Sequence, residues 1–92
     1  MNGRELVAWN LRKLRVAQGL SQEQLAVDAG VDRTYVGGLE RGTANPTVAI
    51  LDRLAATLSV HLSELFREPR RGSVRPAPMR GGRRPVTSRR QG

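Results

Sequence analysis

The sequence of 92 residues predicts an all-α protein, with a helical domain at residues 1–68 and a basic tail at residues 69–92. In the first part, apolar residues recur three or four positions apart, which is typical of amphipathic helices. Serine, aspartate and threonine, which favour helix starts, precede several of these segments, and glycine follows several of them. After Pro69 this pattern ends, and arginine, proline and glycine dominate the sequence.

The first predicted helix covers residues 4–18. Val7, Leu11 and Leu14 form its apolar stripe, and Gly19 is its expected stop. Trp9 lies beside this stripe, where it either closes the edge of the core, or a subunit contact, or stacks on a nucleic-acid base. We favour the packing role for Trp9.

Residues 21–41 predict two short helices joined by a tight turn. Ser21 is a good N-cap, and Gln24 three positions later completes the pattern of a capping box. Gly30 ends the first of the two helices, because glycine adopts the left-handed conformation without a clash of Cβ. Asp32 is the N-cap expected for the second helix, which Gly42 ends.

The second of these helices has two unlike faces. Val36 and Leu39 mark the side expected to be buried. The other side is a single stripe at helical spacing, made of Arg33, Thr34, Gly37, Gly38 and Arg41. Each glycine inside a helix costs about 1 kcal/mol relative to alanine. We therefore expect the two glycines on an open face that lies close against a ligand.

This stretch resembles the helix-turn-helix of the Cro/cI-type (XRE-like) regulators of bacteria and phages. The resemblance rests on LSQEQLA, on Gly30-Val31-Asp32, on RTYVGGLERG and on Asn45-Pro46-Thr47, and it spans roughly residues 11–66. It implies a five-helix, phage-repressor-like domain in which the third helix enters the major groove of DNA.

The fourth and fifth helices are expected at residues 47–58 and 61–66. Thr47 is the N-cap of the fourth, and its apolar face consists of Val48, Ile50, Leu51, Leu54, Ala55 and Leu58. Leu62, Leu65 and Phe66 of the fifth are expected to close the core. The chain departs from the usual family pattern at Ser59, where glycine is usual, and at His61, where serine or threonine is usual.

The resemblance also implies roles for individual residues. Arg15 and Glu40 match a family pair that joins the end of the first helix to the recognition helix, and we expect an ion pair between them. Arg33 and Thr34 are the expected base contacts, since an arginine can donate two bonds to guanine and a threonine can contact thymine. By family correspondence Asp32 and Gly38 also face the bases, although the carboxylate of Asp32 is more simply explained as a helix cap.

Contacts to DNA phosphates are expected from a second group of residues around the recognition helix. This group consists of Gln22, Tyr35, Arg41, Thr43 and Asn45. Such contacts fix the position of the protein on the duplex and carry no sequence information themselves. For Tyr35, packing over the loop is an equally good interpretation.

The net charge of +8 comes from 16 basic and 8 acidic residues, and all of it falls in the tail. Residues 69–92 contain eight arginines and no acidic residue, and too few apolar residues to form a core. We therefore expect a disordered tail. It either gives nonspecific help to nucleic-acid binding, which we favour, or is a solvated extension without a fixed role.

Composition excludes several other classes of function. The sequence has no cysteine and one histidine, so neither a disulfide framework nor a metal site is expected. No nucleophile, base and orienting acid can be assembled, and no cofactor-binding motif occurs, so an enzyme is not expected. No apolar run is long enough to span a membrane. We expect a cytoplasmic protein.

The favoured function is sequence-specific binding of double-stranded DNA by a transcriptional regulator of repressor type, acting as a homodimer. One alternative is an antitoxin or a restriction-modification controller that also binds a partner protein. Another is an adaptor in which the helical domain binds protein and the tail binds RNA. RNA-binding modules usually expose aromatic side chains, and this chain has only three aromatic residues.

Overall fold

The computed structural model describes residues 1–70, which form four α-helices and one short 3-10 helix. The predicted tail therefore lies almost entirely outside the described residues. The helices are α1 (Gly3–Ala17), α2 (Gln22–Ala29), α3 (Arg33–Arg41) and α4 (Val48–Thr57), and the 3-10 helix is η1 (Leu62–Phe66). The all-α class and the places of the helices agree with the sequence-based prediction.

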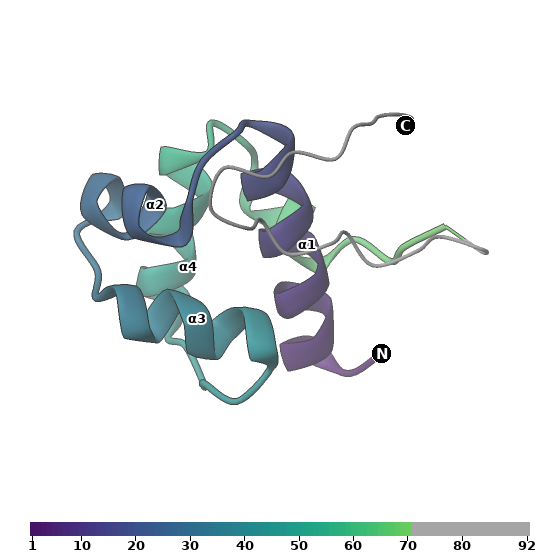
Figure 1. Ribbon diagram of the computed structural model, residues 1–92. Coiled ribbons are helices and arrows are strands. Elements are labelled where there is room, and N and C mark those ends of the chain that lie inside the picture. Colours follow the sequence, from purple (N-terminus) through teal and green to yellow (C-terminus); the bar gives the residue numbers. More distant parts are fainter. Residues whose placement is uncertain (71–92) are drawn as a thin grey trace.

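The elements surround one apolar core (Figure 1). Helix α3 packs against α1 and α2, while α4 packs against α2 and η1, and η1 also contacts α1. The valine and leucine side chains that are 2% exposed or less fill the centre: Val7, Leu11, Leu25, Val36, Leu39, Leu54, Leu58 and Leu65. Helix α3 therefore packs on the core through Val36 and Leu39, and its first residues lie at the surface.

Helix ends follow the local sequence closely. The hydroxyl oxygen of Ser21 accepts from the backbone N–H of Gln24 at 3.0 Å, and the Thr47 hydroxyl caps α4 in the same way. Gly30 ends α2 in the left-handed conformation at φ 72°. A complete capping box forms at the start of α1, where Asn2 and Glu5 bond each other's backbone N–H.

The fifth element is not the α-helix that the sequence predicted. Only five residues separate His61 from Arg67, where the backbone is extended, and the N–H of Glu64 donates to the carbonyl of His61. That bond spans three residues, as in a 3-10 helix, and so short a segment gains little from α-helical bonds. His61 serves as the N-cap through Nδ1, which accepts from the N–H of Ser63 at 3.1 Å.

Two apolar residues expected in the core lie at the surface instead. Val48 is 66% exposed and Phe66 is 41% exposed. Val48 is the first residue of α4 and lies on the outer side of that helix, whereas Leu51 and Leu54 turn inward. Trp9 is buried, in agreement with the packing role, and its Nε1 has no hydrogen-bond partner among the described residues.

Candidate nucleic-acid interface

The start of α3 presents two polar side chains to solvent. Arg33 and Thr34 are both exposed, as expected for residues that reach a ligand. Asp32 lies just before them, and its Oδ1 accepts from the backbone N–H of Thr34 at 2.7 Å. Asp32 thus has the capping role. This bond fixes the first turn of α3 from which Arg33 and Thr34 project.

The two glycines of α3 do not form the open face that the sequence predicted. Both Gly37 and Gly38 are buried. A Cβ on Gly38 would lie 3.3 Å from Cβ of Ala44 and 3.5 Å from Oγ1 of Thr43, so the following loop covers this glycine. The predicted open face is therefore wrong for Gly38, and the base contact expected there by family correspondence stays a prediction.

Gly38 instead anchors the loop that follows α3. Its carbonyl oxygen accepts from the backbone N–H of Thr43 at 2.9 Å and from that of Ala44 at 3.2 Å. The Thr43 hydroxyl donates to the same oxygen at 3.2 Å. Close packing of backbone on backbone explains a glycine here without any ligand. The donor that Thr43 was expected to offer to a phosphate is already used inside the protein.

Gly37 has different neighbours. A Cβ at this position would lie 3.2 Å from Nη1 of Arg41 and 3.6 Å from Oε1 of Gln22. Both atoms are far ends of side chains. The side chain of Arg41 therefore folds back along α3 and lies beside Gly37. A larger residue at position 37 would leave less room for it.

The ion pair expected between Arg15 and Glu40 is present, and both of its side chains are buried. Nε of Arg15 donates to Oε2 of Glu40 at 2.6 Å, and Nη2 donates to Oε1 at 2.8 Å. The third nitrogen, Nη1, donates to the carbonyl of Leu20 at 2.8 Å. The two side chains are 3% and 0% exposed. The pair therefore fixes α3 to α1 and to the chain before α2.

Two further side chains donate to the same carboxylate. Nε2 of Gln22 lies 3.1 Å from Oε1 of Glu40, and Nε of Arg12 lies 3.4 Å from that oxygen. Burial alone would raise the pKa of Glu40, but hydrogen bonds from Arg15 and then Gln22, the charge of Arg15 and the bond from Arg12 outweigh it. The pKa of Glu40 is therefore held below its ordinary value of 4.5.

Arg12 is the residue of this site that sequence analysis missed. It lies three positions before Arg15, and residues at that spacing share one face of a helix. A partner opposite Arg15 is therefore within reach of Arg12 too. Asn10 was also missed, because its role is visible only in the fold: its side-chain amide donates to the carbonyls of Leu65 and Arg67 at 3.1 and 2.8 Å.

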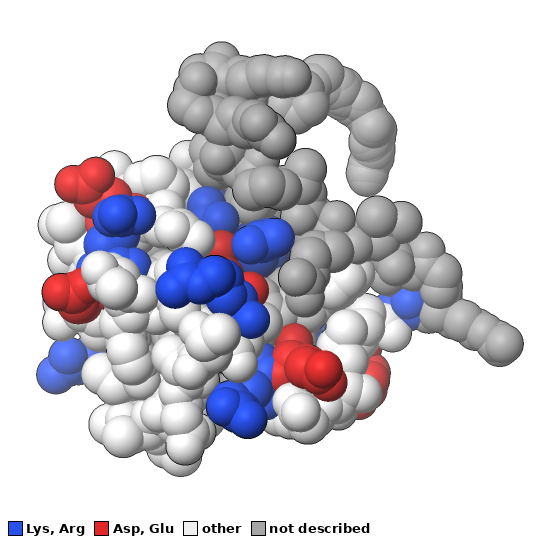
Figure 2. Space-filling view, turned by 60° about the horizontal axis from the view of Figure 1, so that its bottom comes forward, with Lys and Arg blue, Asp and Glu red and all other residues white. Residues whose placement is uncertain are grey.

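The remaining expected phosphate contacts lie at the border of this site. Arg41 and Asn45 are exposed, whereas Tyr35 is half-buried and packs against the core. Figure 2 turns the lower side of Figure 1, with α3 and its loop, toward the viewer. Lysine and arginine side chains gather near the centre of that face, and most of the visible acidic ones lie nearer its edge (Figure 2).

Within residues 1–70, no group of three or more histidine or acidic side chains is placed to hold a metal ion. No helix in that part of the chain is long and apolar enough to cross a membrane.

Helices α2 and α3 are joined by a tight turn, and α3 exposes Arg33 and Thr34 at its start while the ion pair of Arg15 and Glu40 holds its buried side. This arrangement defines a helix-turn-helix protein. A helix-turn-helix family model, HTH_3, matches residues 11–65. The chain belongs to this family, the Cro/cI-type helix-turn-helix transcriptional regulators.

Relatives of known structure support the same assignment. The hypothetical transcription factor NHTF from Neisseria is 40% identical, with a TM-score of 0.72, and the match covers 74% of this chain and 78% of that one. The restriction-modification controller C.AhdI from Aeromonas hydrophila is 46% identical, with a TM-score of 0.67 and coverage of 68% and 96%.

Among curated sequences, control protein C.SmaI of Serratia marcescens is 42% identical over 66 residues, which is 72% of this chain and 79% of C.SmaI. A hypothetical transcription factor of Neisseria meningitidis is 41% identical over 66 residues, which is 72% of this chain and 62% of that protein. The chain thus spans about three-fifths of that last relative.

Proposed function

We propose that this protein binds a specific double-stranded DNA sequence, with α3 in the major groove, and thereby represses transcription. The observation that carries the proposal is the exposure of Arg33 and Thr34 at the start of α3. The Asp32 cap fixes the first turn of that helix, and the ion pair of Glu40 with Arg15 fixes its buried side. Residues at the start of the second helix are the ones that reach base edges in helix-turn-helix proteins.

The exposure and the positions of the side chains around α3 support the following proposed roles. Arg33 donates to guanine, and Thr34 contacts a neighbouring base. Arg41, Asn45 and the N-terminal end of α2 at Gln22 contact phosphates, because backbone N–H groups at a helix start favour anions. Tyr35 adds a phosphate contact through its hydroxyl. Thr43 contributes chiefly by holding the loop to α3.

Selection of duplex DNA from a random library by the purified protein tests this proposal. The expected result is a consensus with two-fold symmetry and half-sites about one helical turn apart. Recovery of no consensus above the input library would overturn the proposal.

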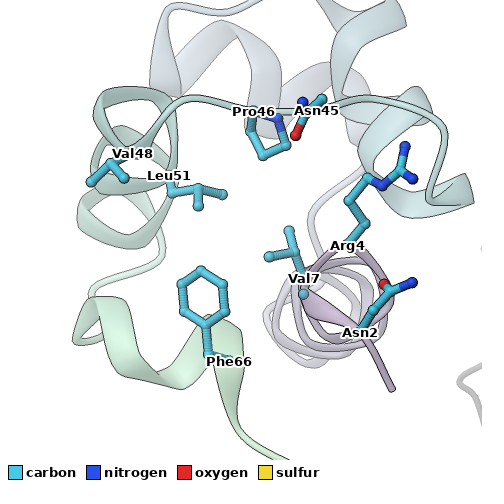
Figure 3. Close-up of a pocket in the computed structure, with 9 residues that line it drawn as sticks. Asn2, Arg4, Val7, Asn45, Pro46, Val48, Leu51 and Phe66 are labelled. Carbon is cyan, nitrogen blue, oxygen red and sulfur yellow. The ribbon is translucent and has the colours of Figure 1, made fainter.

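We also propose that the protein is a homodimer joined through α4 and η1. A groove of about 490 Å³ lies between the start of α1, the loop before α4, and η1. Val7, Pro46, Leu51 and Phe66 converge on it, and Val48 lies at its rim (Figure 3). Exposed apolar side chains beside such a groove indicate a contact with another protein chain. A second copy of this chain is the proposed partner, because one short recognition helix contacts only a few base pairs and two copies contact a longer DNA site.

Sedimentation of Val48→Lys tests the dimer. This variant is expected to be a monomer, because a charge would be buried at the contact. Val27→Lys is a matched control, since Val27 is 70% exposed on α2, away from the groove. A dimer that survives in the Val48 variant would exclude this surface.

A second candidate function is the control of a restriction-modification system. C.AhdI supports it, because this chain matches 96% of that controller's length at 46% identity. The test is genomic: the selected consensus should lie upstream of genes for an endonuclease and a methyltransferase. A consensus found only elsewhere would exclude the controller role.

A further inference from the structure

Within residues 1–70, Arg12 has one acidic partner, Glu40, which it shares with Arg15. The carboxylate of Glu40 is already matched by Arg15, which makes two bonds to it of 2.6 and 2.8 Å. Arg12 adds a second positive charge through a single longer bond of 3.4 Å. An arginine side chain stays protonated in proteins, so the surplus charge is permanent. One carboxylate cannot neutralise two guanidinium groups.

This surplus charge lies at the border of the proposed interface. The Arg12 side chain is 15% exposed, whereas that of Arg15 is 3% exposed. Arg12 shares the oxygen Oε1 of Glu40 with Nε2 of Gln22. Arg12 of α1 is thereby placed beside the first residue of α2.

Arg41 also lies near Gln22, beside Gly37. Oε1 of Gln22 and Nη1 of Arg41 both lie within 4 Å of the point that a Cβ of Gly37 would occupy. The missing side chain at Gly37 leaves room for the guanidinium of Arg41 to lie next to Gln22. Three helices therefore bring Arg12, Gln22 and Arg41 close together. Among the described residues, Glu40 is the only acidic side chain bonded to Arg12 or Gln22.

We infer that Arg12 binds a DNA phosphate, as one side of a site that Gln22 and Arg41 complete. The inference rests on the proposed function, because it names a further contact of the same interface. Glu40 positions Arg12 through Nε, which leaves the two outer nitrogens of the guanidinium to donate to phosphate oxygens. The contact is made to the backbone and is the same for any DNA sequence.

A purely structural role for Arg12 predicts a different outcome. If Arg12 served only to neutralise Glu40, removing its charge would alter stability and leave the salt dependence of DNA binding unchanged. A phosphate contact has the opposite signature. Each phosphate neutralised contributes about 0.9 to the slope of log K against log salt concentration.

The experiment compares Arg12→Gln with Lys13→Gln on the duplex selected by the wild-type protein. Lys13 is the neighbouring exposed cation on α1, and no hydrogen bond or ion pair within residues 1–70 joins it to Glu40. Both variants lose one charge. Binding is measured by fluorescence anisotropy at several salt concentrations, and thermal unfolding checks the fold of each variant.

The slope for Arg12→Gln is expected to be less steep than that of the wild type by about 0.9, with the selected consensus unchanged. The slope for Lys13→Gln is expected to equal that of the wild type. An unchanged slope for Arg12→Gln, or an equal loss in both variants, would overturn the inference while leaving the proposed function intact. Failure of the wild-type protein to prefer any duplex would instead overturn the proposed function.

A measurement on the unaltered chain covers the case in which Arg12→Gln does not fold. The Nε–H resonance of Arg12 is followed by NMR while the selected duplex is added, with that of Arg53 on α4 as the reference. A shift of the Arg12 resonance that saturates with the duplex, and none for Arg53, is expected. No shift at Arg12 would overturn the inference.

Discussion

Arg15 and Glu40 lie 25 positions apart in the sequence and form an ion pair with two hydrogen bonds beneath the recognition helix. Because Nη1 of Arg15 also donates to the carbonyl of Leu20, the pair joins α1, the chain entering α2, and α3. The orientation of α3 is therefore fixed on its buried side by groups that need not touch DNA. The residues at the exposed start of α3 can therefore differ, to suit different DNA sequences, without loss of this ion pair.

Breaking this pair from one side should be costly. Glu40→Ala removes the buried carboxylate to which Arg15 makes two bonds, and the free energy of unfolding is expected to fall by about 3–5 kcal/mol. Arg15→Met with Glu40→Ala should cost clearly less than the two single changes added together. Urea unfolding of the four proteins measures this, and strictly additive losses would show that the pair does not act as a unit.

Stability should also depend on pH through Glu40. Because the pKa of Glu40 in the folded protein lies below its ordinary value of 4.5, the ionised form stabilises the fold above that pH. This stabilisation is lost as the pH falls from about 4.5 through the lowered pKa, when the buried carboxyl takes up a proton. Thermal melting from pH 7 to pH 3 should therefore show a steeper loss of stability for the wild type than for Glu40→Gln. Parallel curves would contradict this role.

The two glycines of α3 should respond differently to substitution. Gly37→Ala meets only the ends of two side chains, and alanine gains about 1 kcal/mol of helix propensity, so stability should hold or rise. DNA affinity should nevertheless fall, because Arg41 is displaced from Gln22. Gly38→Ala meets Cβ of Ala44 at 3.3 Å and should be the less stable of the two variants.

Chemical unfolding and DNA binding of both glycine variants provide the measurement. If Gly37→Ala bound the selected duplex as tightly as the wild type, the position assigned to Arg41 would be wrong. A Gly38 variant more stable than the Gly37 variant would contradict the packing of the loop on α3.

Ser59 gives a separate prediction about stability. It is the only non-glycine residue with positive φ in the described part of the chain, at 58°. Such a conformation costs an ordinary residue roughly 1 kcal/mol, and Ser59 is exposed. Ser59→Gly is expected to raise the melting temperature by about 4–8 °C, the shift that corresponds to about 1 kcal/mol in a domain of this size. Calorimetry measures the change, and a lower melting temperature would contradict it.

Much of the fold could be predicted because its signals are local. Ser21, Asp32 and Thr47 cap the helices that follow them, and periodic apolar residues mark the buried faces. The signals that failed depend on tertiary contacts. Gly37 and Gly38 fit an open face and a covered one equally well in sequence, and only the path of the loop through Ala44 decides between them.

The same reason limits prediction of the site. The pair of Arg15 and Glu40 was predicted from resemblance to a family, since nothing local joins residues 25 positions apart. Arg12 was missed although it lies on the same helical face as Arg15, because its significance depends on how many charges one carboxylate already binds. Val48 fits the apolar stripe of α4 by spacing, yet it is 66% exposed.

The most direct test of the account is DNA selection repeated with Arg33→Ala, beside the wild-type protein. If α3 reads the bases through its first turn, the variant should lose its preference at one position in each half-site and keep the rest of the consensus. The loss should correspond to about 1–3 kcal/mol of discrimination at that position. A consensus identical to that of the wild type would show that the first turn of α3 does not read DNA.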